Sequence, residues 1–457
     1  MADSGWSPEA LRLLEHAWQR CAHYLGQLER RAVAASPAAI AALQRLDEPL
    51  PVRGNPPAKT LELLDQLVSP ATSAMAGPRF FGFVIGGTLP AALAANWLAG
   101  SWDQNAAFFA TTPGVARLEQ LALRWLLELF ELPVETAAAF VTGATLANFT
   151  ALAAARHAVL ARVGWNVEAD GLFGAPPISV IVGEEAHPSL LKALGMLGLG
   201  RSRIVRVPVD DQGRMRVDAL PVITGPSILC LQAGNVNSGA SDPLAALIAA
   251  GQQQGAWVHV DGAFGLWARV SPPQRAQVEG VERADSWATD AHKWLNVPYD
   301  SGVALVRDAA ALSAAMAVSA EYLPAAGAAR NPCDYTPELS RRARGVEVWA
   351  ALHSLGRAGI AELVQRNCAQ AAEFAARLEA AGYQVLNRVV LNQVLVSFGD
   401  AERTRAVVEA LQREGTCWCG ITVWQGRTAM RISVSNWSTQ QQDVDRSVEA
   451  MLRVARA

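Results

Sequence analysis

The stretch Ser286-Trp-Ala-Thr-Asp-Ala-His-Lys-Trp-Leu-Asn-Val-Pro-Tyr-Asp-Ser-Gly302 decides how the rest of the chain is interpreted. Its centre is Lys293, which stands between His292 and Trp294 in a mostly uncharged segment. A lysine in such surroundings can titrate below its ordinary range and act as an amine nucleophile. A surface lysine that follows a strand is the alternative, and the preceding stretches have to distinguish the two.

The bulk composition narrows the classes of partner. The chain has 457 residues, enough for two or three domain-sized units with a large shared core. The net charge is -3, and interspersed acidic and basic residues predict no attraction to nucleic acid or to an anionic membrane. Hydrophobic residues make up 51% and charged residues 18%, which indicates extensive burial and is compatible with a subunit interface. We expect small molecules or other subunits as partners.

The cysteines indicate the compartment. Six cysteines without a C-x-x-C pair, and no recognisable signal segment, predict reduced thiols in a cytoplasmic protein. Cys417 and Cys419 flank Trp418 and are expected in the core, so no metal site is predicted. No apolar run approaches the ~20 residues that a membrane helix needs.

The order of helical and strand-like patterns predicts the fold class. Residues 1–75 alternate helical patterns with proline-rich connectors and predict an arm whose apolar faces need a partner surface. Seven strand-like runs follow, several of them separated by helical segments, at residues 138–141, 178–182, 203–209, 228–232, 257–260, 286–289 and 303–306. This α/β pattern predicts a mostly parallel seven-stranded sheet with helices on both faces. After about residue 345, helices and short strands predict a smaller α/β domain.

Four features are predicted at strand ends, where ligands bind in such sheets. The turn 142–145 (Thr-Gly-Ala-Thr) opens a helix and suits a phosphate, although many strand-to-helix turns contain these residues. His187 precedes Pro188 at the same edge, and a structural hydrogen bond is its alternative role. Asp261 ends an apolar strand and would have to be paired, either by a protonated cofactor ring nitrogen or by the next turn. Lys293 is the fourth feature. Together they are the parts that a pyridoxal phosphate enzyme requires.

The chain resembles the pyridoxal-phosphate-dependent group II decarboxylases, the family of aromatic-L-amino-acid and glutamate decarboxylases, over nearly its full length. The most specific matches are Asp290-Ala-His-Lys-Trp, His259-Val-Asp-Gly-Ala and Thr142-Gly-Ala-Thr-Leu-Ala-Asn. Ala186-His-Pro-Ser and Gly77-Pro-Arg-Phe-Phe-Gly support the resemblance. It implies a fold-type-I architecture, pyridoxal 5'-phosphate as the cofactor, and a homodimer with shared active sites.

Carried over by motif, the resemblance implies roles around the cofactor ring. Lys293 would hold the cofactor aldehyde as a Schiff base, and Asp261 would pair with the pyridine nitrogen. His187 would stack on one face of the ring and Ala263 would pack against the other. Tyr322, on a loop after the lysine, would supply a proton across the dimer interface.

The resemblance also implies a phosphate site. Ala144, Thr145 and His292 would hold the phosphate together with Asp290, although an acid facing a phosphate departs from the asparagine common in the family. Asn235 stands in a Gly-Asn-Val sequence where Gly-Thr-Thr is common, and it would take the threonine's place near the cofactor.

The resulting hypothesis is a homodimeric decarboxylase of an L-amino acid. We expect an N-terminal arm (1–75) that packs on the partner subunit, a large cofactor-binding domain (76–345) and a small C-terminal domain (346–457). An aromatic substrate is favoured because aromatic residues fall where the family builds its pocket: Phe80, Phe81, Phe83, Trp102, Phe108 and Phe109. Asn105 and Ala107 would make that pocket more polar or roomier. The alternatives are an aldehyde-forming oxidative deaminase or C-C lyase on the same scaffold, and a catalytically silent binding or scaffold protein.

Overall fold

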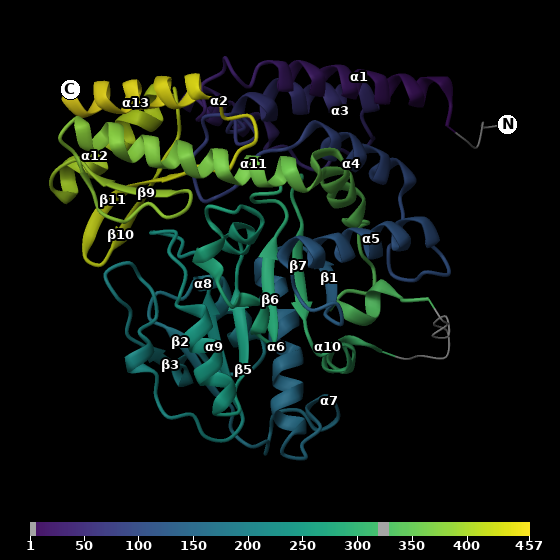
Figure 1. The fold of residues 1–457 in the computed structure, drawn as a ribbon. Helices are drawn as coiled ribbons and strands as arrows, with labels where there is room; N and C mark the ends of the chain where they lie inside the picture. Colours follow the sequence, from purple (N-terminus) through teal and green to yellow (C-terminus); the bar gives the residue numbers. More distant parts are fainter. Residues whose placement is uncertain (1–5, 319–328) are drawn as a thin grey trace.

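The computed structural model describes residues 6–318 and 329–457 of the chain (Figure 1). Its large sheet has seven strands in the order β1-β7-β6-β5-β4-β2-β3. The strands are β1 Ala137–Val141, β2 Ser179–Gly183, β3 Val205–Val207, β4 Ser227–Gln232, β5 Trp257–Asp261, β6 Ser286–Asp290 and β7 Gly302–Val306. Strands β3, β2, β4, β5 and β6 are parallel, and β7 is antiparallel to both of its neighbours. The predicted seven-stranded, mostly parallel sheet is confirmed.

Helices cover both faces of this sheet because its strands are apolar on both sides. On β2, Ile181 belongs to a core shared with helices α5 (Pro113–Phe130) and α9 (Leu244–Gln253). Its neighbours Val180 and Val182 point to the opposite core, which contains α6 (Ala144–Ala161), α8 (Pro188–Met196) and α10 (Ala309–Met316). This period of two is the geometry of a strand buried on both faces.

A second sheet lies in the C-terminal part, as Figure 1 shows. Its order is β10-β11-β9-β8, with β8 Gln384–Val385, β9 Gln393–Ser397, β10 Gly420–Trp424 and β11 Arg427–Ser433. Three helices pack with it: α11 Gly345–Ala380, α12 Ala401–Glu414 and α13 Gln441–Arg456. Helix α11 is interrupted at Gly356, whose φ of 60° and ψ of 176° are not helical. Both Cys417 and Cys419 are buried in the core of this part, as predicted.

A short N-terminal segment is built into this second part. The Trp418 N–H donates to Arg79 O (3.0 Å), the Phe81 N–H donates to Trp418 O (2.8 Å), and the Ser433 N–H donates to Phe81 O (2.9 Å). The Phe81 side chain is buried edge-on against Phe374, with ring centroids 5.1 Å apart. Residues 79–81 therefore complete a core that is otherwise made by the C-terminal part.

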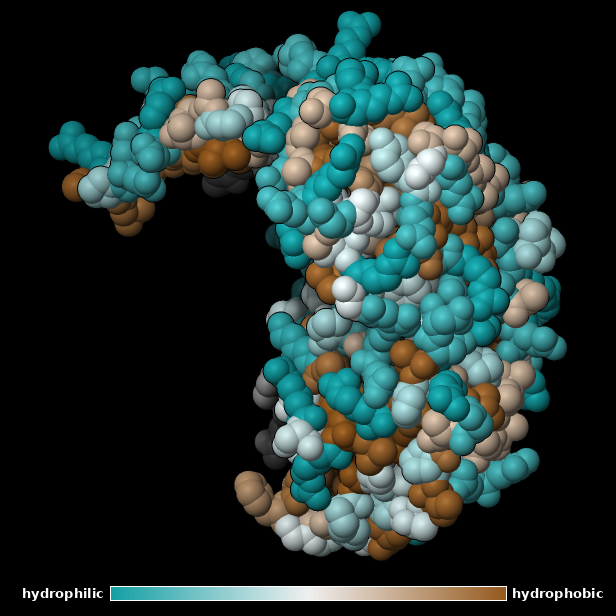
Figure 2. Space-filling view, turned by 90° about the vertical axis from the view of Figure 1, so that its left-hand side faces the viewer, coloured by the Kyte–Doolittle hydropathy of each residue, from teal (hydrophilic) through white to brown (hydrophobic). Residues whose placement is uncertain are grey.

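The first helices form an arm at the top of Figure 1: α1 Pro8–Gly26, α2 Pro37–Ala42 and α3 Pro57–Leu63. Helix α4 (Pro90–Trp102) follows and packs against α11. Large apolar side chains of α1 remain exposed, among them Leu11, Leu14 and Trp18. Figure 2 shows an arm that projects at the top over a hollowed side of the molecule and carries hydrophobic residues on its underside. The domain limits at residues 75 and 345 stay predictions. No helix within the described ranges is long and apolar enough to cross a membrane.

Two further segments pack closely against the rest of the chain. In the run Arg341-Arg342-Ala343-Arg344, the Arg341 guanidinium is buried and lies 2.8 Å from a Glu119 carboxylate oxygen. The glycine-rich segment 77–88 approaches the backbone at Lys293. A Cβ on Gly86, at φ +76°, would lie 2.0 Å from Lys293 O.

Candidate active site

The structure brings the predicted ring-binding residues into one cavity at the strand ends. Lys293, Asp261, His187 and Ala263 line it. The remaining wall consists of Phe83, Val84, Gln232, Gly234, Val236 and Phe264. An amine, a carboxylate and an imidazole thus line one cavity, although the three residues are far apart in the sequence.

Asp261 ends strand β5 and is held in place by two donors. Asn148 Nδ2 donates to Oδ2 over 3.1 Å, and the Ala263 N–H donates to Oδ1 over 3.3 Å. Burial raises the pKa of Asp261, and the nearby His187 and Lys293 counteract that shift. Such a carboxylate needs a cationic partner, and a protonated ring nitrogen meets that need.

Asn148 is itself oriented by a chain of buried groups. Because its Nδ2 donates to Asp261, its Oδ1 must accept from His259 Nε2, 2.8 Å away. His259 Nδ1 then accepts from Ser286 Oγ (2.9 Å), and Trp257 Nε1 donates to the same hydroxyl (2.9 Å). Burial lowers the pKa of His259 to about 3, so the ring stays neutral. We call this hydrogen-bonded chain, which joins Asn148 of helix α6 to His259 and Trp257 of strand β5 and Ser286 of strand β6, the relay. It holds Asp261 in place.

The sequence contained a signal for this relay. His259 and Asp261 are two residues apart in a strand and therefore point to the same face. Asn148 ends the matched motif 142–148, one helical turn after Ala144. The motif alone gave no reason to join them, because 113 residues separate Asn148 from Asp261.

His187 caps helix α8, and its ring orientation is fixed from one side. The Ser189 N–H donates to Nδ1 (3.2 Å), and the Ser189 hydroxyl lies 2.7 Å from the same atom. Burial lowers the pKa of His187, although the Asp261 carboxylate opposes this shift. The site therefore contains a neutral imidazole plane, which suits stacking on an aromatic cofactor.

Lys293 and His292 lie beside the carboxylate of Asp290. Lys293 Nζ lies 3.0 Å from Asp290 Oδ2, and His292 Nε2 lies 3.7 Å from it. His292 Nδ1 accepts from the Ser301 N–H (3.1 Å), and the ring stacks on Tyr299 with centroids 4.2 Å apart. Burial lowers the pKa of His292. Asp290 thus serves as the counterion of the lysine in the structure.

The N-terminus of helix α6 fits a phosphate. Ala144 begins the helix and Thr145 follows, so their N–H groups have no partner within the helix. A Cβ on Gly143 would lie 3.2 Å from the His292 ring, a tight contact, so the glycine helps to keep the space between helix and ring open. Asp290 Oδ1 and Ser301 Oγ are buried here and have no hydrogen-bond partner in residues 6–318 and 329–457. The tight turn and the free N–H groups suit a bound phosphate, and the Ser301 hydroxyl can donate to it, whereas the ionised Asp290 carboxylate has no donor to offer an anion.

Two predicted residues stand apart from this set. Asn235 is fully buried, and its side chain is occupied: Nδ2 donates to Glu185 (2.9 Å), while Oδ1 accepts from the Asn237 and Ser238 N–H groups. Its neighbours Gly234 and Val236 line the cavity instead. Tyr322 lies outside the described residues.

Arg431 on strand β11 is a cavity neighbour that the sequence interpretation missed. Its Nη1 donates to Val236 O over 3.3 Å, and its guanidinium lies 5.8 Å from the centroid of the Phe83 ring. Its buried Nε has no partner among the residues that the structure describes, and burial lowers the pKa of the group. A buried cation with unused donors beside this cavity is suited to an anionic group of a ligand.

The aromatic residues proposed for the pocket divide between different places. Phe83 lines the cavity. Phe80 stacks on Trp418 with centroids 4.9 Å apart, whereas Phe81 belongs to the C-terminal core. Asn105 uses its side-chain oxygen to accept from the Arg341 N–H (3.0 Å). Within one chain, Phe83 alone of these is found in the cavity wall.

Comparison with known proteins agrees with this geometry. Residues 41–399 match the family described as "Pyridoxal-dependent decarboxylase conserved domain". The chain belongs to this family. Its members are pyridoxal-phosphate-dependent carboxy-lyases, so the cofactor is pyridoxal 5'-phosphate, as the site residues require.

The relatives of this chain within the decarboxylase family differ in their substrates. The chain is 27% identical to tryptophan decarboxylase 1 of Oryza sativa subsp. japonica, over 86% of this chain and 83% of the relative. It is 30% identical to L-2,4-diaminobutyrate decarboxylase of Rhizobium meliloti (strain 1021), over 79% and 73%. The structure of Oryza sativa TDC with PLP and tryptamine superimposes with a TM-score of 0.90 at 24% identity, covering 98% of each chain. That likeness shows the fold.

Proposed function

We propose that this protein removes the α-carboxylate of an aromatic L-amino acid and releases the amine and carbon dioxide. The observation that carries the proposal is the shared cavity of Lys293, Asp261 and His187 with Phe83 in its wall. In the reaction the bond between Cα and the carboxylate carbon breaks, carbon dioxide leaves, and a proton takes its place on Cα. Pyridoxal phosphate, when bound, accepts the electrons of the broken bond.

The residues of the chain have separate tasks in this proposal. The Lys293 amine holds the cofactor and yields to the amino group of the substrate. Asp261, fixed by Asn148, keeps a proton on the ring nitrogen. His187 and Ala263 hold the two faces of the ring.

The remaining tasks concern the phosphate, the lysine and the protons. Ala144, Thr145 and His292 hold the phosphate, with Asn235 behind the cavity wall. Asp290 holds the amine of Lys293 in place once substrate has displaced it, because the two already lie 3.0 Å apart. Tyr322 supplies the proton to Cα.

An aromatic side chain is supported by the wall of the cavity and by one relative. Phe83 lines the cavity, and Trp418 continues the aromatic surface with its ring centroid 5.4 Å from that of Phe83. The relative from Oryza sativa is a tryptophan decarboxylase. Arg431 would attract a carboxylate of the substrate to this side.

We infer a homodimer with shared active sites from the arm. Exposed Leu11, Leu14 and Trp18 on α1 would lose contact with water if a second copy covered them. A partner copy would also be the source of Tyr322. The cytoplasmic location stays a prediction.

The deciding experiment measures products from a panel of L-amino acids. Loaded protein is incubated with tryptophan, phenylalanine, tyrosine, glutamate and 2,4-diaminobutyrate, and amine, carbon dioxide, aldehyde and ammonia are quantified. We expect amine and carbon dioxide in equal amounts from an aromatic amino acid, and none from Lys293→Ala. Aldehyde with ammonia as the main products would overturn decarboxylation, and turnover of 2,4-diaminobutyrate alone would overturn the substrate class.

A further inference from the structure

Strands β10 and β11 form a hairpin whose tip is fastened to the large sheet through one carboxylate. Glu185 Oε2 accepts from Trp424 Nε1 (2.9 Å) and from Asn235 Nδ2 (2.9 Å), and Oε1 accepts from Gln425 Nε2 (3.0 Å). Trp424 ends β10, and Gln425 is in the turn before β11. A single side chain thus joins the hairpin tip to the loop 234–239.

The contact is closely fitted. Gln425 has a φ of 47° and also donates to Asp210 O over 3.0 Å, so the turn is held at two points. A Cβ on Gly213, at φ +76°, would lie 2.4 Å from Glu185 Oε2. Only glycine at residue 213 leaves room for the carboxylate in this position.

Glu185 stands two residues before His187, the histidine that we propose stacks on the cofactor. It lies in the turn between β2 and α8, closed by a hydrogen bond from the Ala186 N–H to Gly183 O (3.0 Å). His187 follows two residues later and caps α8. A displacement of Glu185 therefore shifts the short connection that carries the ring of His187.

The other end of the hairpin lies beside the cavity, where it contacts the lining residue Val236. Strand β11 runs from Arg427 to Ser433 and carries Arg431, which donates to Val236 O. Val236 belongs to the same loop that Asn235 ties to Glu185. The Glu185 carboxylate is therefore linked both to His187, through the turn, and to Arg431, through strand β11.

We propose that Glu185 is a positioning residue that sets the spacing between His187 and Arg431 by fastening the β10–β11 hairpin to the large sheet. Glu185 does not touch the reacting atoms in this role. The inference rests on the proposed decarboxylase function for its kinetic test, and on the cofactor site alone for its spectroscopic test.

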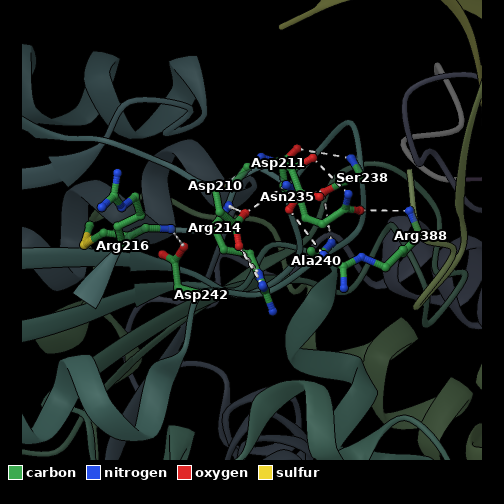
Figure 3. Close-up of polar contacts among 12 residues, drawn as sticks. Asp210, Asp211, Arg214, Arg216, Asn235, Ser238, Ala240, Asp242 and Arg388 are labelled. Carbon is green, nitrogen blue, oxygen red and sulfur yellow. Dashed lines mark hydrogen bonds and ion pairs between the residues drawn. The ribbon is translucent and has the colours of Figure 1, made fainter. Parts of the chain in front are cut away.

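A neighbouring contact offers a matched control. Figure 3 shows Arg388, from the connection between β8 and β9, close to the cluster that includes Asp210, Asp211 and Ser238. Arg388 Nη2 lies 3.2 Å from Asp211 Oδ1, and the two side chains are 65% and 75% exposed. This ion pair also joins the C-terminal part to the large sheet, but water can replace it.

The test compares the wild-type protein with Glu185→Ala, Trp424→Phe and the double variant, each loaded with pyridoxal phosphate. We expect the visible circular dichroism of the bound cofactor to change in Glu185→Ala, and KM to rise about tenfold with a smaller change in kcat. The double variant should be no worse than Glu185→Ala, because both single changes remove the same contact. Asp211→Asn should leave KM and the dichroism at wild-type values.

A circular dichroism spectrum of Glu185→Ala that matches wild type, or kinetic losses that add in the double variant, excludes the fastening role. If wild type decarboxylates no amino acid, the proposed function fails, while the spectra of the loaded proteins still decide the role of Glu185. Trp424→Phe keeps the proposal testable should Glu185→Ala not fold.

Discussion

At the scale of single residues, Asn148 connects the cofactor site to the interior of the fold. Its amide can satisfy Asp261 and His259 at once only because one end donates and the other accepts. An aspartate or a leucine of similar size would satisfy only one of the two or neither. The ionised form of Asp261, which we propose faces the ring nitrogen, is therefore stabilised by the neutral side chain of Asn148.

For Asn148→Leu we expect at least about a tenfold loss of affinity for pyridoxal phosphate and about 1–3 kcal/mol lower stability. The reason is that the substitution leaves His259 Nε2 and one oxygen of Asp261 without partners in a buried place. Dialysis followed by absorbance of the retained cofactor measures the first effect, and urea unfolding the second. Thr150→Val is the control, because the Thr150 hydroxyl bonds only within helix α6, to Leu146 O. Equal cofactor retention in both variants would contradict the relay.

At the scale of elements, the end of strand β4 is held by Asp242, a buried carboxylate whose charge depends on pH. Asp242 follows strand β4 and accepts from the Gln232 and Met215 N–H groups, each at 2.7 Å. Figure 3 shows it beside Arg214 and Arg216 in this network. Burial raises the pKa of Asp242 to about 6, so the folded protein binds a proton there more tightly than the unfolded chain does.

The raised pKa of Asp242 makes its contribution to the stability of the folded protein larger at low pH. The stability contributed by protonation of Asp242 is fully present below pH 3.8, the ordinary value, and is lost as pH rises through about 6. Relative to Asp242→Asn, which does not titrate, wild type should lose roughly 2 kcal/mol of unfolding free energy across this window. Urea unfolding of both proteins at a series of pH values measures the difference. A constant difference would show that the pKa of Asp242 is the same in the folded and the unfolded protein. Asp47→Asn, at an exposed position, serves as the control.

The junction of β7 and helix α6 gives a prediction about packing. A Cβ on Gly302 would lie 2.5 Å from Gly143 Cα, at the turn that fits the phosphate. Gly302→Ala should therefore displace the start of α6, weaken cofactor binding and cost about 1–3 kcal/mol. Cofactor titration and thermal unfolding test this, with Gly54→Ala as the control because nothing lies within 4 Å of its Cβ. Unchanged cofactor affinity would mean that the phosphate does not use this turn.

At the scale of the whole molecule, the proposed exchange of Tyr322 between subunits makes each active site a product of two chains. Co-expressed Lys293→Ala and Tyr322→Phe chains, each inactive alone, should recover about a quarter of wild-type activity, because half of the dimers contain one intact site out of two. Product assays on the purified mixture measure the recovery. No recovery from confirmed mixed dimers would place Tyr322 at the site of its own subunit.

Leu14→Glu together with Trp18→Glu should shift the protein toward monomer in light scattering, because both side chains are exposed on α1.

Local sequence patterns predicted the features that depend on neighbours in the chain. The seven strands were visible because their apolar runs are separated by helices, and Lys293, Asp261 and His187 because they follow strand ends. Asn148, Glu185 and Arg431 were missed because their partners lie far away in sequence. Strand β10 lacks a continuous apolar run, because three of its five residues are not buried, and it was not predicted. The burial of Arg341 could not be predicted from the sequence, because its partner Glu119 is more than two hundred residues away.

The insertion of residues 79–81 between Trp418 and Ser433 has a consequence for protein engineering. A gene cut near residue 345 would yield a C-terminal fragment that lacks the Phe81 side chain beside Phe374 and leaves backbone groups of Trp418 and Ser433 without partners. Such a fragment would present an open edge and a hydrophobic hole, and it would tend to associate with itself. Chimaeras that exchange the C-terminal part between family members should therefore carry residues 77–88 with it, so that each donor sequence supplies both halves of one core.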